Sequence, residues 1–208
     1  MTHQPDQTDF QQQLDMAGRL VDRAIRTFFE GDDPLFVLAL ANPGHVLFHE
    51  IARIKCDGNN SASRMVDSFR DLGVKTPSGK PVSAVSDLLA VLRRDANSLK
   101  HIGVTPRVSD ASVIATLIVA TIDAQDLQVL SAPQLLFMAW AYAGNSEPLD
   151  PAWDTADLLF DALKGLDPAE RKRCGLNRLN DPFIMESLEQ TVQEAGMRAG
   201  VGMNDDNG

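Results

Sequence analysis

The sequence predicts an all-α protein, a single-domain bundle of about seven or eight helices. Apolar residues recur at three- and four-residue steps through most of the chain, which is the spacing of one helix face. No segment shows the sustained apolar–polar alternation that marks a half-buried strand. The 208 residues are 44% hydrophobic but only 6% aromatic, a composition typical of a helical domain with one sizeable core.

The first helices are predicted from periodicity and capping residues. Apolar side chains recur from Phe10 to Phe28, which indicates one long amphipathic helix, and Gly31 ends it. Asp33-Pro34 places a capping carboxylate before a proline at the first helical position. Asn42-Pro43 repeats this signature, so we expect the helix there to kink or restart and a third helix to run from about 43 to 56.

The middle of the chain predicts a short helix over 61–72, a turn-rich connection over 75–81 and a helix that opens at Ser83. A further helix opens at Asp110. It is apolar on most sides, which predicts that it lies at the centre of the bundle.

The C-terminal third predicts three more helices. Ser131-Ala132-Pro133 caps one whose residues are core, with Trp140 at the rim. The other two lie around 151–163 and 181–198. Residues 1–8 are expected to be a flexible N-terminus, 9–198 the bundle domain, and 199–208 a disordered tail.

The location predicted for the chain is the cytoplasm. No secretion signal is apparent at the start, and no apolar run approaches the roughly 20 residues of a membrane span, so no membrane association is expected. Cys56 and Cys174 form neither a disulfide framework nor a metal-ligand spacing, and we interpret them as reduced thiols. No cofactor is predicted.

The charge distribution is uneven. The net charge is −10, which argues against nonspecific nucleic-acid binding and against DNA sequence recognition. Residues 53–107 nevertheless carry 10 basic and 5 acidic side chains. This third of the chain is therefore the place for a local positive patch, with ordinary solvated helix faces as the alternative.

The strongest local pattern lies at the end of the helix that opens at Ser83. Arg94, Asn97 and His101 are three, four and seven residues apart, so they share one helix face. The apolar residues of the same segment lie on the opposite face: Val85, Leu88, Leu92 and Leu99. The polar face is therefore predicted to meet water or a second surface, with Arg93 and Lys100 as further candidate binding residues.

A second candidate group is the histidine pair His45 and His49, four residues apart on one face of the predicted third helix. Leu47, Ile51 and Ile54 are expected to mark the core side, with both histidines roughly opposite. Ala52 lies on the histidine face and permits the close approach of another element.

These histidines allow two metal interpretations. The segment that starts at His49-Glu50 has Arg53 where a zinc-protease motif requires its second histidine, so that motif is rejected. A site made by His45, His49 and His101 is a runner-up interpretation, because zinc and nickel accept imidazole nitrogens.

Three segments resemble small bacterial helical proteins of the HEPN type. They are ANPGHVL at 41–47, DANSLKH at 95–101, similar to the family's ANxxKH motif, and LFMAW at 136–140. Together they span about residues 40–145. The resemblance implies a HEPN-like helical core and a homodimer, with an RNA or protein partner.

Active HEPN proteins are metal-independent ribonucleases with an arginine and a histidine separated by a short spacing. Six residues separate Arg94 from His101, at the long limit of that spacing. By resemblance, His101 would act as general acid or base on the ribose 2′-hydroxyl and Arg94 would stabilise charge on the phosphate, with Asn97 beside them. Many relatives only bind, and a noncatalytic interaction domain is the first expectation. The ribonuclease is the alternative, and the three-histidine metal protein is the second alternative.

Overall fold

The computed structural model describes residues 7–55, 66, 75–76, 78–98, 108–143, 159–160, 163 and 165–201. This part of the chain is helical, with one isolated antiparallel bridge between Lys75 and Pro81 and no strand. The all-α prediction is confirmed. The helices are α1 (Gln7–Glu30), α2 (Pro34–Lys55), α4 (Val85–Ser98), α5 (Asp110–Asp126), α6 (Ala132–Ala143), α8 (Pro168–Leu179) and α9 (Pro182–Val201).

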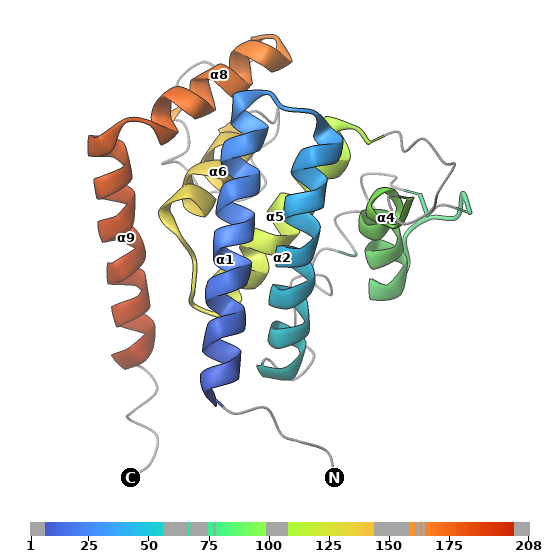
Figure 1. Ribbon diagram of the computed structural model, residues 1–208, viewed down its shortest axis with the longest axis horizontal. Helices are drawn as coiled ribbons and strands as arrows, with labels where there is room; N and C mark the ends of the chain where they lie inside the picture. Colours follow the sequence, from blue (N-terminus) through green and yellow to red (C-terminus); the bar gives the residue numbers. More distant parts are fainter. Residues whose placement is uncertain are drawn as a thin grey trace.

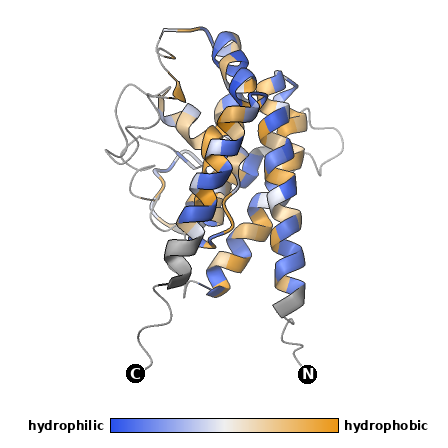
Figure 2. Ribbon diagram, turned by 90° about the vertical axis from the view of Figure 1, so that its left-hand side faces the viewer, coloured by the Kyte–Doolittle hydropathy of each residue, from blue (hydrophilic) through white to orange (hydrophobic). Residues whose placement is uncertain are grey.

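The helices form a bundle around α1, α2 and α5, which pack on one another (Figure 1). Helix α6 lies against α1 and α5, and α8 crosses one end of the bundle. Helix α9 then runs back along the α6 side, whereas α4 flanks α2 and α5 on the opposite side. The apolar faces of the helices turn toward one another and their polar faces turn outward (Figure 2).

Helix boundaries follow the capping residues. Gly31 has φ +83°, a left-handed conformation that ends α1 as predicted. Asp33 accepts a hydrogen bond from the Leu35 backbone N–H at 2.8 Å, and α2 begins at Pro34. The same arrangement at Asp167-Pro168 begins α8, with Asp167 accepting from two backbone N–H groups. Helix α8 was not predicted, although its sequence carries the same signature.

Helix α2 continues through Pro43 as one helix of 22 residues. The expected restart at Asn42-Pro43 is therefore wrong, and the predicted second and third helices are one element. Tertiary packing outweighs the local proline signal here, because α2 lies against both α1 and α5. Gly44, directly after the proline, lets α1 approach so closely that an added Cβ would lie 2.7 Å from Val21 Cγ2 and 3.0 Å from the Ala17 carbonyl oxygen.

Four aromatic rings fill the end of the core beneath α8. Phe28 and Phe29 of α1 contact Phe137 and Trp140 of α6, with ring centroids 5.3–6.1 Å apart. Trp140 is 3% exposed, and its indole N–H donates to the Arg171 carbonyl oxygen at 2.8 Å. Trp140 was expected at the rim of the core, but α8, the helix that the sequence analysis missed, covers it.

A half-buried carboxylate joins α1 to the start of α6. One oxygen of Asp22 accepts from the Ser131 hydroxyl at 2.6 Å and from the Gln134 amide at 3.0 Å. Burial raises the pKa of Asp22, and both hydrogen bonds oppose that rise. The Ser131 cap predicted from the sequence therefore also holds two helices together.

Several predicted elements lie wholly or mostly outside the described residues: the helices over 61–72 and 151–163 and most of the tail over 199–208. Helix α9 reaches Val201, beyond its expected end at 198. The helix predicted from Ser83 is confirmed as α4, because the Ser83 backbone N–H and hydroxyl both donate to the Asp87 carboxylate.

Among the described helices, α2 is long and apolar enough to cross a membrane by length and composition alone. From the sequence, no such segment was expected, because no apolar run approaches the length of a membrane span. Half of the apolar stretch is buried inside the bundle, and the core helix of a water-soluble protein passes the same test. Its length and composition are therefore those of a membrane-spanning helix and equally those of a buried core helix.

The close approach at Gly44 gives a matched pair of substitutions. Gly44→Ala should lower the free energy of unfolding by about 1–2 kcal/mol, because the new Cβ meets a β-branched side chain and a backbone oxygen. Gly18→Ala in α1 meets nothing within 4 Å and should raise it by about 0.5–1 kcal/mol through helix propensity. Urea unfolding measures both, and equal stabilisation by the two changes would contradict the packing described here.

Candidate metal centre

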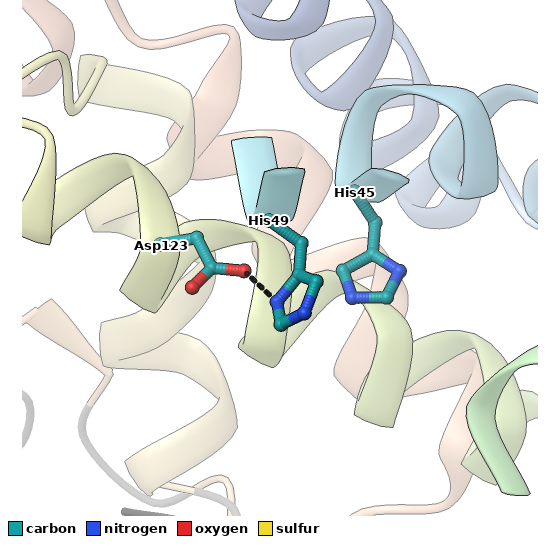
Figure 3. A group of neighbouring side chains, drawn as sticks. All are labelled: His45, His49 and Asp123. Atoms are coloured by element: carbon teal, nitrogen blue, oxygen red, sulfur yellow. Dashed lines mark ion pairs between the residues drawn. The ribbon is translucent and has the colours of Figure 1, made fainter. Parts of the chain in front are cut away.

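Two histidines and one carboxylate meet in the core between α2 and α5. His45 and His49 lie one turn apart on α2, and Asp123 faces them from α5 (Figure 3). Their exposed fractions are 0%, 2% and 0%. Ionisable side chains are seldom buried so completely unless they are paired or bind a ligand.

The spacing of the three side chains approaches that of a coordination shell. His49 Nδ1 lies 3.5 Å from Asp123 Oδ2, and the two imidazole rings are 5.9 Å apart between centroids. One donor atom from each residue can be chosen so that all three lie within 4.8 Å of one another. Donors bound to one metal at about 2.1 Å lie roughly 3.0–3.5 Å apart, so the His49–Asp123 pair already fits and His45 needs a shift of about 1 Å.

The imidazole of His45 lacks the hydrogen bonds that normally accompany burial. Neither of its ring nitrogens has a hydrogen-bond partner within the part of the chain that the structure describes. His49 Nδ1 also makes no well-aligned hydrogen bond, despite its short distance to Asp123. An unsatisfied buried polar group costs about 1–3 kcal/mol, so these nitrogens call for an explanation.

Burial also sets the charge of His45. Desolvation lowers the pKa of His45 to about 4; Asp123 opposes this, whereas electrostatic interactions with His49 and Arg93 add to it. The ring is therefore neutral at pH 7 and keeps a lone pair on one nitrogen. A neutral imidazole is the form that binds metals.

The histidine pair was predicted from the sequence, but on the face of the helix opposite the core. Ile54, expected in the core, is 54% exposed, whereas both histidines are buried. Ile51 is buried, as predicted. The buried face of α2 includes small residues that a hydrophobicity pattern underweights: Ala41, Gly44 and Ala52. Because Gly44 lets α1 approach closely, the core face is rotated by roughly 100° from the predicted one.

The predicted site residues on α4 are only partly described. Arg94 is exposed, as expected for a face turned away from the core, and Arg93 is half-buried. Asn97 lies in α4, but its side chain is outside the described part of the structure. Lys100 and His101 also lie outside the described residues, so the three-histidine site stays a prediction.

Asp123 is the ligand candidate that sequence reasoning missed. Its signal is a charged residue within the otherwise apolar stretch of α5, where a buried helix face leaves no water to solvate it. The ligand set of two imidazoles and one carboxylate suits first-row transition metals. His45 and His49 have the spacing of a zinc-protease helix, but Val46 stands where that motif needs its glutamate base.

No protein-family model, curated protein or solved structure matches the chain. The assignment of a function therefore depends on the geometry of the site.

The lowered pKa of His45 predicts an acid-sensitive fold in metal-free protein. The unfolded chain takes up a proton near pH 6.5 and the folded chain only near 4, so stability present above 6.5 is lost as the pH falls between these values. Between pH 7 and 4.5 this loss is about 2–3 kcal/mol. In His45→Leu that part of the loss should be absent.

Urea unfolding at both pH values in the presence of a chelator measures the difference. His3→Leu is the control, because it removes a histidine outside the site and should keep the pH dependence of the wild type. The same pH dependence in all three proteins would show that His45 is not held neutral.

Proposed function

We propose that this protein binds one divalent first-row transition-metal ion in the core of its helical bundle through His45, His49 and Asp123. The observation that carries the proposal is the fully buried His45 ring, whose nitrogens have no partner in the described structure, beside the His49–Asp123 pair.

A metal ion would account for all three side chains at once. It would bind the lone pair of each neutral imidazole, and its positive charge would stabilise the buried carboxylate. The alternative is a histidine–carboxylate contact with no ion. That arrangement leaves both nitrogens of His45 without a partner among the residues described and gives no reason for a second buried imidazole.

The donor set limits the identity of the ion. Two nitrogens and one carboxylate favour zinc, iron(II), cobalt or nickel over calcium and magnesium, which prefer oxygen ligands. Three protein ligands also leave at least one coordination position for water or a small molecule. The site would therefore be suited to binding or activating such a ligand as well as to bracing α2 against α5.

The noncatalytic HEPN-like interaction domain, with its ribonuclease alternative, is a second candidate function. Arg94 is exposed on α4, which this candidate requires if the residue is to meet RNA or a protein. The ribonuclease alternative predicts cleavage of single-stranded RNA in EDTA by the wild type but not by His101→Ala. Absence of cleavage by the wild type would remove the nuclease.

The metal proposal predicts binding of about one equivalent of zinc or cobalt(II) per chain by protein first stripped with chelator. His45→Ala, His49→Ala and Asp123→Asn should each weaken binding at least 100-fold, because each removes one of only three protein ligands. Metal should raise the melting temperature of the wild type but not that of the variants, since an ion that binds only the folded state stabilises it.

Calorimetric titration and elemental analysis after dialysis measure affinity and stoichiometry. His3→Ala, which removes a histidine outside the proposed site, should bind metal like the wild type. Circular dichroism confirms that each variant is folded. A wild-type chain that retains no transition metal, or a folded Asp123→Asn variant that binds it undiminished, would overturn the proposal.

A further inference from the structure

We infer that the exogenous ligand of this centre is a small oxyanion, a carboxylate or a phosphate, held between the metal ion and the guanidinium group of Arg93. This inference rests on the proposed metal site and names the chemical class of molecule that the site would take.

Helix α4, which carries Arg93, packs against both helices that carry the metal ligands. Leu88 and Leu92 of α4 form a small apolar cluster with Val119 of α5. Asp123 lies one turn beyond Val119 on the same face of α5, and Arg93 directly follows Leu92. Helix α4 also contacts α2, the helix that carries both histidines.

The guanidinium of Arg93 has two donors to offer. Its Nε and Nη2 atoms are both buried and have no hydrogen-bond partner in the described parts of the chain. These two nitrogens form one edge of the guanidinium, from which two parallel N–H bonds point in the same direction. That edge matches two oxygens of one carboxylate or phosphate group.

Charge balance favours the same ligand. The negative charge of Asp123 and the positive charge of Arg93 balance each other before a metal ion binds. A bound divalent ion adds two positive charges that no described side chain of the site neutralises. A buried excess of positive charge is costly, and an anion bound to both the metal and Arg93 reduces it.

The experiment uses the full-length chain loaded with cobalt(II), whose visible absorption changes when a ligand enters the coordination shell. Acetate, oxalate and inorganic phosphate are titrated separately. At least one anion should alter the spectrum and saturate. Arg93→Gln should weaken that anion at least 10-fold while binding cobalt(II) within about 3-fold of the wild type.

Two further variants define the role of the guanidinium. Arg23→Gln removes the same charge from an exposed position on α1 and should leave anion affinity unchanged. Arg93→Lys keeps the charge but loses the paired donors, so its anion affinity should fall between those of the wild type and Arg93→Gln.

The outcomes separate the two proposals. Failure of the wild type to bind cobalt(II) overturns the metal site and this inference with it. Cobalt(II) binding with no spectral response to any of the three anions overturns the inference alone, as does an Arg93→Gln variant that binds the anion like the wild type. A response to acetate or oxalate only identifies a carboxylate ligand, and a response to phosphate only identifies a phosphate.

Discussion

The close packing of α2 between α1 and α5 is the constraint on which the rest of the structure depends. Gly44 on the buried face of α2 allows α1 to approach closely, and Ala41 and Ala52 lie on the same buried face. The approach carries α2 through Pro43 without a break and turns His45 and His49 inward with the core residues. Protein interiors are dense, so side chains on this face exchange water for fixed neighbours. Both histidines lose their solvation in this way, which determines how they can bind protons and metals.

Burial has two linked consequences at the site. It keeps His45 neutral, which costs stability in acid but preserves the lone pair that a metal needs. It also leaves ring nitrogens and guanidinium edges without water, so only a ligand or a protein group can satisfy them. The proposed metal ion and oxyanion would each supply missing partners for these buried groups. The metal ion would accept lone pairs from the ring nitrogens, and the oxyanion would accept hydrogen bonds from the guanidinium N–H groups.

Much of the fold could be predicted from the sequence, because apolar periodicity and capping residues are local signals. The Asp-Pro signal that begins α2 at Asp33-Pro34 also begins α8 at Asp167-Pro168, although α8 was not predicted from it. The site was less predictable. A hydrophobicity pattern predicts that Ile54 is more buried than Gly44. In the structure Ile54 is exposed, whereas Gly44 lies where α1 and α2 are in close contact, because only a small residue fits there. Asp123 joins the histidines only through tertiary contact between helices far apart in the chain.

The peripheral position of α9 has a consequence for how the molecule opens. This helix contacts α6 and α8, and Leu188 is its one fully buried residue in the described structure. Cooperative units with few buried contacts open at a lower free-energy cost than the core. Amide hydrogens of α9 should therefore exchange with solvent through a local opening that leaves α2 and α5 closed. Helix α9 can therefore detach and return while α2 and α5 stay packed around His45, His49 and Asp123.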